Sequence, residues 1–68
     1  MRHFIFYISD FSGGGAESVI VRISNEMILR DNSVTIIVDR ASGALLSLVH
    51  PKIKIIELPM TSFFGKIF

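Results

Sequence analysis

The sequence predicts an α/β fold, a partial Rossmann-like parallel sheet with the element order β-α-β-β. Apolar, largely β-branched runs at residues 3–9, 34–39 and 52–58 have the length and composition of strands. An amphipathic stretch from Ala16 to about Arg30 separates the first run from the second. Strand, glycine-rich loop, helix and strand follow one another within about 37 residues, which is typical of a βαβ unit.

The three strand-forming runs differ in pattern. Residues 3–9, HFIFYIS, show little polar alternation, which is typical of a strand covered on both faces. Residues 34–39, VTIIVD, end in an acid, and residues 52–58, KIKIIEL, are stopped by Pro59. Crossovers between strands of one sheet are right-handed, so we expect the first two strands to be parallel neighbours.

The predicted helix carries a broad apolar face. Three further apolar residues, Val21, Ile28 and Leu29, widen it, which suits a helix placed between a sheet and another layer. Its end is predicted near Asn32, a residue that can take the left-handed capping conformation. The main stripe repeats at spacings of three and four: Ala16, Val19, Ile20, Ile23 and Met27.

Two segments are less regular. Residues 40–51, RASGALLSLVHP, are predicted to form a loop with a short helix closed by Pro51. Residues 60–68, MTSFFGKIF, place Phe63, Phe64, Ile67 and Phe68 at about helical spacing, so a second helix is expected to begin there and to supply core contacts. The prediction for residues 1–68 is therefore the truncated N-terminal part of a Rossmann-like domain.

Composition excludes several classes of function. Half of the 68 residues are hydrophobic, the formal net charge is +1, and the basic residues are scattered, so we expect no nucleic-acid partner. Without cysteine there is no disulfide, no thiol nucleophile and no cysteine zinc site, and His3 and His50 lack partners at metal-ligand spacing. No signal-peptide or membrane-spanning pattern is present, which favours the cytoplasm.

The stretch SDFSGGGAES at residues 9–18 is the strongest functional signal. A glycine-rich turn that opens a helix directs backbone N–H groups and the positive end of the helix dipole at one point, which suits an anion. The structural alternative is a tight turn that lets the helix pack closely on the sheet. The candidate substrate- or phosphate-binding residues are Gly13, Gly14 and Gly15, together with Asp10 at the end of the first strand.

Two nucleotide-binding patterns can be compared with this stretch. A triphosphatase loop requires Lys and Ser or Thr after its last glycine, whereas Ala16 and Glu17 stand there. The dinucleotide pattern G-x-G-x-x-G is matched at its first two glycines but fails at Ser18. Asp39 ends the second strand 21 residues further on, where an acid could hold a ribose. An NAD(P)-binding fragment of an oxidoreductase therefore stays as an alternative.

The chain also resembles the N-terminus of the family 4 retaining glycosyltransferases with the GT-B fold. The resemblance rests on Gly-Gly-Ala-Glu at residues 14–17, on the strand at residues 34–38, and on KIKIIELP at residues 52–59. Asn32 and Ser33 stand where members commonly carry Gly-His. The helix contributes four further matching residues: Ile23, Asn25, Glu26 and Met27.

The resemblance implies a sugar transferase. Such an enzyme would move a sugar from a nucleotide-sugar donor to a glycan or lipid-linked acceptor in cell-surface polysaccharide synthesis. Gly13, Gly14 and Gly15 would line its cleft. The family's donor-binding acidic motif lies in a C-terminal domain, so the chain would hold no catalytic residue, no metal and no cofactor, and would be inactive alone. The further alternative is a non-enzymatic, truncated remnant.

The resemblance also bears on partners and location. The full-length enzyme would bind the nucleotide sugar and the acceptor in the cytoplasm. Membrane-associated members use apolar and basic residues in the region that corresponds to residues 63–68. The resemblance therefore also implies a possible site of peripheral association with the inner face of the membrane.

Overall fold

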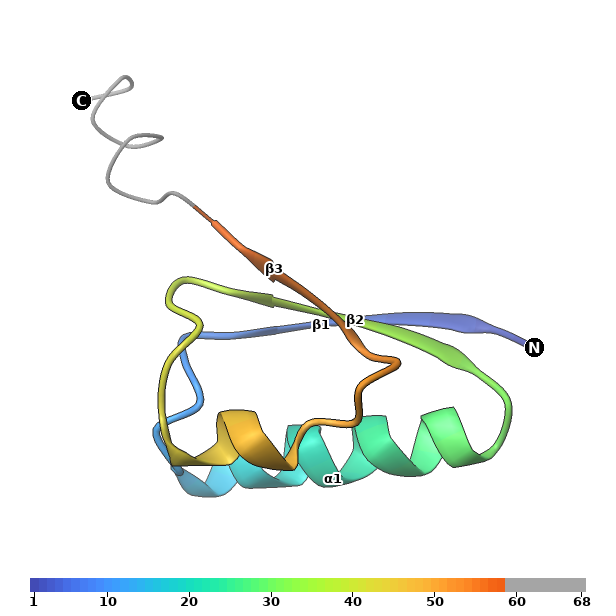
Figure 1. Ribbon diagram of the computed structural model, residues 1–68, viewed down its shortest axis with the longest axis horizontal. Helices are drawn as coiled ribbons and strands as arrows, with labels where there is room; N and C mark the ends of the chain where they lie inside the picture. Colours follow the sequence, from blue (N-terminus) through green and yellow to red (C-terminus); the bar gives the residue numbers. More distant parts are fainter. Residues whose placement is uncertain (59–68) are drawn as a thin grey trace.

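A computed structural model describes residues 1–58 of the chain. Its elements are β1 (His3–Ile8), α1 (Gly15–Leu29), β2 (Ser33–Val38), the 3₁₀ helix η1 (Ala44–Leu48) and β3 (Lys54–Glu57) (Figure 1). The predicted order of strands and helix is confirmed, as is a short helix between the second and third strands. The helix expected in residues 60–68 lies outside the described residues.

The three strands form one parallel sheet in the order β1-β2-β3. Phe4 is paired with Val34, and Ile36 is paired with Ile55, so β2 lies in the centre. The prediction that the first two strands are parallel neighbours is confirmed. Because the strands are parallel, their carboxyl ends lie at one edge of the sheet, which we call the carboxyl edge.

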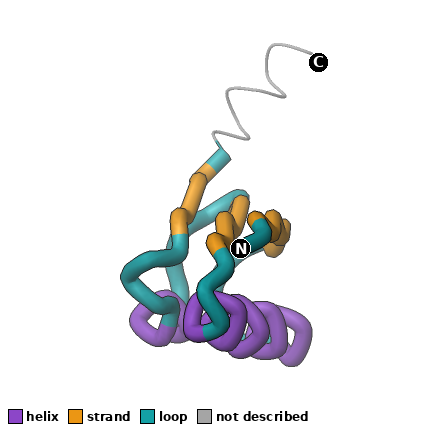
Figure 2. Tube along the Cα trace, turned by 90° about the vertical axis from the view of Figure 1, so that its right-hand side faces the viewer, coloured by secondary structure: helices purple, strands orange, loops and turns teal. Residues whose placement is uncertain are grey.

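Both helical connections lie on the same face of the sheet. The views in Figures 1 and 2 show α1 and η1 together in one layer below the strands. A chain that steps from strand to strand in one direction, with crossovers of one hand, places its connections on one side. The expectation that the first strand is covered on both faces therefore fails for residues 1–58, where Ile5 and Tyr7 are more than half exposed.

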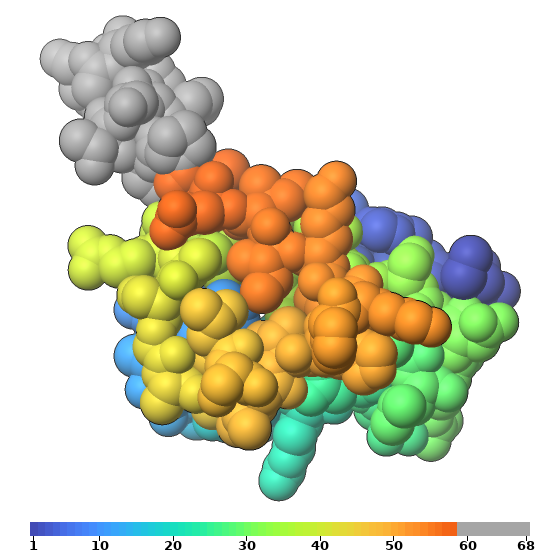
Figure 3. Space-filling model, viewed as in Figure 1, coloured from blue at the N-terminus to red at the C-terminus, as the bar shows by residue number. Residues whose placement is uncertain are grey.

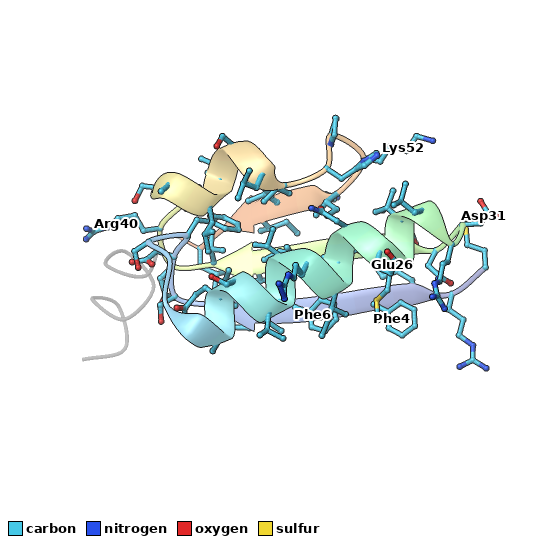
Figure 4. The ribbon with its side chains drawn as sticks, turned by 90° about the horizontal axis from the view of Figure 1, so that it is seen from below. Phe4, Phe6, Glu26, Asp31, Arg40 and Lys52 are labelled. Atoms are coloured by element: carbon cyan, nitrogen blue, oxygen red, sulfur yellow. The ribbon has the colours of Figure 1, made fainter. Side chains whose placement is uncertain are left out.

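The core lies between the sheet and this helical layer. The β2 side chains Val34, Ile36 and Val38 are almost completely buried, as expected for the central strand. In Figure 4, seen from the helical side, Phe4 and Phe6 of β1 flank α1. Figure 3 shows the chain from η1 to β3 covering one side of the molecule. The full set of buried apolar residues is Ile8, Phe11, Val21, Val34, Ile36, Val38 and Ile53.

The inward face of α1 agrees with the prediction only in part, since Ile20 and Met27 of the predicted stripe pack against the core. Val21 and Ser24 are buried, whereas Val19 and Ile23, predicted for the main stripe, are 49% and 40% exposed. Apolar residues occupy most sides of this helix, so their spacing alone did not define which side is inward. Ser24 is completely buried, and a small residue at such a position lets a helix pack closely.

The end of α1 also differs in detail. Asp31, rather than Asn32, takes the left-handed conformation, with φ of 66°. Asn32 instead caps the helix by hydrogen bonds, because its backbone N–H and its side-chain amide both donate to the carbonyl of Met27, at 3.0 and 3.2 Å. An exposed ion pair between Glu26 and Arg30, at 3.1 Å, lies on the last turn of α1.

Candidate functional site

The glycine loop lies at the carboxyl edge of the sheet, where it joins β1 to α1. Gly13 has φ of +111°, a conformation that side-chain-bearing residues rarely adopt. Gly14 is the extended N-cap residue of α1, and Gly15 begins the helix. In Figure 4 Arg40 marks this edge, and Asp31 and Lys52 mark the opposite one. Open parallel sheets bind ligands outside the carboxyl ends of their strands.

The start of α1 has backbone N–H groups that no helical carbonyl accepts. The N–H of Ser18 donates to the carbonyl of Gly14 at 3.0 Å, which is the first bond of the helix. The N–H groups of Gly15, Ala16 and Glu17 precede that bond, and no side chain caps the helix at Gly14. Together with the helix dipole they favour negative charge at this point.

Glu17 already places a negative charge there. A Cβ atom built on Gly14 would collide with Oε1 of Glu17, so this carboxylate lies over the N-cap residue. At Gly13 and Gly15, by contrast, an added Cβ would meet no atom within 4 Å. An incoming anion would therefore approach from the open side of the loop, over Gly13 and Gly15, or would displace the flexible Glu17 side chain.

A second loop holds the glycine loop in place. Phe11 is completely buried, its N–H donates to the carbonyl of Ser42 at 2.9 Å, and its carbonyl accepts from the N–H of Leu45 at 2.9 Å. Gly43, with φ of +125°, lies so close that a Cβ would collide with the carbonyl group of Phe11. Sequence reasoning missed Phe11 and Gly43, because the contact joins segments about thirty residues apart in the chain.

Asp10, a predicted site residue, caps the loop in this structure. Its Oδ1 accepts a hydrogen bond from the N–H of Ser12 at 2.9 Å. Hydrogen bonding by the side chain and backbone of Ser12, with a smaller contribution from the charge of Arg40, lowers the pKa of Asp10. The carboxylate lies at the carboxyl edge as predicted, and its role toward a substrate stays a prediction.

Asp39 follows β2 at the same edge and pairs with β1. Its N–H donates to the carbonyl of Ser9 at 3.1 Å, and its Oδ2 accepts a hydrogen bond from the phenol of Tyr7 at 2.5 Å. That hydrogen bond is the main reason why the pKa of Tyr7 is raised. The other oxygen, Oδ1, is buried and has no hydrogen-bond partner among the described residues. Such an acceptor is unusual in a folded protein and suits an additional donor.

The two histidines have structural partners. His3 contacts two hydroxyls through its ring nitrogens, Ser33 Oγ at 2.6 Å and Thr35 Oγ1 at 3.1 Å. His50 accepts a hydrogen bond on Nδ1 from the N–H of Lys52 at 3.0 Å. Within residues 1–58, no three His, Cys, Asp or Glu side chains gather where they could hold a metal ion.

An open hollow of about 350 Å³ lies at the opposite edge of the sheet. Ligands of parallel α/β sheets bind at the other edge, so this hollow does not coincide with the candidate site. Its lining residues are Met1, Ile28, Asp31, Asn32, Ser33 and Lys52.

Fold and site together define a class: a small parallel α/β unit with a glycine loop and two aspartates at its carboxyl edge. Comparison with protein-family models gave no match, and no curated protein or solved structure showed significant similarity to the chain. In the described part of the chain, neither helix has the length and apolarity needed to cross a membrane.

Proposed function

We propose that this chain is the N-terminal, acceptor-side part of a glycosyltransferase of the GT-B type, similar to family 4, that uses a nucleotide sugar. The observation that supports the proposal most directly is the open N-terminus of α1 at the carboxyl edge. There the glycine loop leaves the N–H groups of Gly15, Ala16 and Glu17 without a helical partner.

The chemistry of sugar transfer suits such a loop. When the bond between the sugar and the nucleotide breaks, negative charge develops on the leaving diphosphate. Fixed backbone N–H groups stabilise developing charge without a side chain. The carboxylates of Asp10 and Asp39, at the same edge, suit the hydroxyls of a carbohydrate acceptor. The residues that bind the rest of the donor would belong to a second domain, so the 68-residue chain alone is expected not to transfer sugar.

The same proposal covers the partners and the location. The intact enzyme would take a glycan or lipid-linked acceptor in cell-surface polysaccharide synthesis. It would act in the cytoplasm or at the inner face of the membrane.

Binding at the loop can be tested on the chain itself. Uridine diphosphate, titrated into isotopically labelled chain, should shift the backbone amide resonances of Gly14, Gly15 and Ala16 more than those of the opposite edge. The amide of Lys52 serves as the internal control. Glu17→Gln should strengthen the binding, because it removes a negative charge beside the anion. Equal shifts at both edges, or none, would count against an anion site.

Assignment to a glycosyltransferase needs a separate test. The coding sequence downstream of residue 68 should encode a second Rossmann-like half with its own glycine turn and an acidic motif. A downstream domain that instead carries a catalytic His or Lys would support an oxidoreductase, and an immediate stop codon would support a remnant.

One observation favours the dinucleotide alternative. Asp39 ends β2 with a buried, unpartnered Oδ1. In dinucleotide-binding folds an acidic residue at this place accepts a hydrogen bond from the adenosine ribose. Titration with NAD⁺ beside uridine diphosphate distinguishes the two: a larger shift of the Asp39 amide with NAD⁺, lost in Asp39→Ala, would favour the oxidoreductase.

A further inference from the structure

A histidine lies between two hydroxyl side chains where β1 and β2 begin, at the edge of the sheet opposite the carboxyl edge. Nδ1 of His3 is 2.6 Å from Oγ of Ser33, and Nε2 of the same ring is 3.1 Å from Oγ1 of Thr35. The strand register pairs His3 with Ser33, and Thr35 lies two residues further along β2, on the same face of the sheet. A serine, an imidazole and a threonine are therefore joined in one line of hydrogen bonds.

This line has the parts of an activated nucleophile. Such a site needs a hydroxyl within hydrogen-bond reach of a base, and a third group that orients the base. When the imidazole carries its proton on Nε2, that N–H donates to Thr35, and Nδ1 can accept the hydroxyl proton of Ser33. Thr35 is only 5% exposed, which limits the positions that its hydroxyl can take beside the ring.

Ser33 also lines the open hollow of about 350 Å³ at this edge. Sites for small molecules usually measure about 300–1,000 Å³, so the hollow is large enough for a ligand. Met1 and Ile28 supply apolar lining, and the ammonium of Lys52 suits the negative charge that develops on a carbonyl oxygen during acyl transfer. The carboxylate of Asp31, at the same edge in Figure 4, disfavours an anionic acyl group. The lining therefore suits a small, neutral, apolar acyl group.

We propose that Ser33 is the nucleophile of a second site, which hydrolyses esters of small apolar carboxylic acids. Oγ of Ser33 attacks the carbonyl carbon of the ester while its proton passes to Nδ1 of His3, and the alcohol departs with that proton. Water then attacks the acyl group on Ser33 and gives a proton to His3. The carboxylic acid leaves as Oγ of Ser33 takes this proton back. Thr35 is a positioning residue, and the inference does not depend on the proposed function.

The alternative is that the three side chains only join the two strands. The N–H of Ser33 donates to the carbonyl of Arg2 at 2.9 Å, and the side-chain bonds would then add to this backbone contact. In that case Ser33 would react no faster than an ordinary serine. A threonine hydroxyl also stabilises an imidazolium less than the carboxylate of a Ser-His-Asp triad does, so turnover is expected to be slow. Covalent labelling of the nucleophile is therefore a more sensitive test than turnover.

The test is the reaction of the folded 68-residue chain with a fluorophosphonate, which bonds to activated serines with loss of fluoride. Peptide mapping by mass spectrometry should find the adduct on Ser33. His3→Gln should slow its formation about 100-fold, because general-base catalysis contributes at least that much in most enzymes. Thr35→Val, which keeps the size of the side chain and removes the hydroxyl, should slow it by a smaller factor. Ser47→Ala, at an exposed serine of η1, is the matched control and should leave the rate unchanged.

A second measurement needs no substitution. The unmodified chain, mixed with p-nitrophenyl butyrate and quenched in acid, should carry a butyryl group on Ser33, and the same chain in urea should not. No adduct on Ser33 with either reagent would overturn the proposal. Labelling of Ser33 that is as fast in urea as in the folded chain, or no faster than labelling of Ser47, would also overturn it.

Discussion

The phenol of Tyr7 donates a hydrogen bond to Oδ2 of Asp39 over 2.5 Å, which joins the carboxyl ends of two neighbouring strands. A carboxylate acceptor makes this bond charge-assisted and therefore stronger than one between neutral groups. It also fixes the Asp39 side chain, whose second oxygen, Oδ1, is buried without a partner in the described residues. One residue of the candidate site is thus oriented by a side chain that sequence reasoning did not select.

We expect this hydrogen bond to be visible in an alkaline titration. The pKa of Tyr7 lies above its ordinary value of 10.0, mainly because its proton is held by Asp39. A raised folded-state pKa stabilises the protein below the unfolded pKa, and this contribution is lost as the pH rises through the folded one. Ultraviolet absorbance should show the single tyrosine ionising above pH 10.0, and in Asp39→Asn the midpoint should fall toward the ordinary value. An unchanged midpoint in Asp39→Asn would mean that the bond is absent in solution.

Gly43→Ala should destabilise the chain strongly. Gly43 has φ of +125°, and a Cβ would collide with the carbonyl group of Phe11, so both backbone strain and overlap oppose the substitution. We expect a loss of about 2–4 kcal/mol in the free energy of unfolding. Urea denaturation followed by circular dichroism measures it.

Gly15→Ala is the matched control for Gly43→Ala. An added Cβ at Gly15 meets nothing within 4 Å, and Gly15 is not in the left-handed region. Alanine there should leave stability unchanged or raise it by about 0.5 kcal/mol, since it restricts the unfolded chain. If both variants lost the same free energy of unfolding, the close approach to Phe11 would not be the reason why position 43 requires glycine.

Asn25 should contribute to stability through a bridge between α1 and η1. Its side-chain amide donates to the carbonyl of Leu48, and its Oδ1 accepts from the N–H of His50, each at 2.9 Å. Asn25→Ala leaves two backbone groups without partners, so we expect a loss of about 1–3 kcal/mol in urea denaturation. Ser47→Ala, which removes only a bond within η1, should change stability by less than about 0.5 kcal/mol.

Phe11→Ala should unfold the chain. Phe11 is fully buried at the junction of the two loops, and its truncation is expected to cost about 3–5 kcal/mol. A core of this size supplies about 3–5 kcal/mol in total, so little stability would remain. Amide hydrogen exchange should lose its protection throughout the sheet. Leu48→Ala, at a side chain that is 61% exposed, should retain protection.

The elements of the fold could be predicted because their signals are local. Apolar runs bounded by Gly, Asn and Pro defined the strands, and the three glycines marked the start of α1. The inward face of α1 was predicted only in part. Ile20 and Met27 of the predicted stripe pack against the core, but Val19 and Ile23 are exposed and Val21 is buried, because residues of equal apolarity lie on several sides of the helix. Asn32 and Asp31 are both suited to a left-handed turn, which explains the error of one residue there.

The candidate site was predictable in position but not in detail. Parallel strands bring the glycine loop, Asp10 and Asp39 to one edge, and strand order alone is enough to infer that. The hydrogen bond from Tyr7 to Asp39 depends on a register between residues 32 positions apart. The close approach of Gly43 to Phe11 likewise depends on how the loop after β2 folds back, which no local pattern reveals.

The two backbone hydrogen bonds of Phe11 connect the glycine loop with the segment that carries η1. Because the carbonyl of Phe11 accepts from the amide of Leu45, ordering of the glycine loop would slow hydrogen exchange of an amide in η1, on a different element. Leu45 would then act as a remote reporter: its exchange rate would reveal the state of the first loop without any label being placed there.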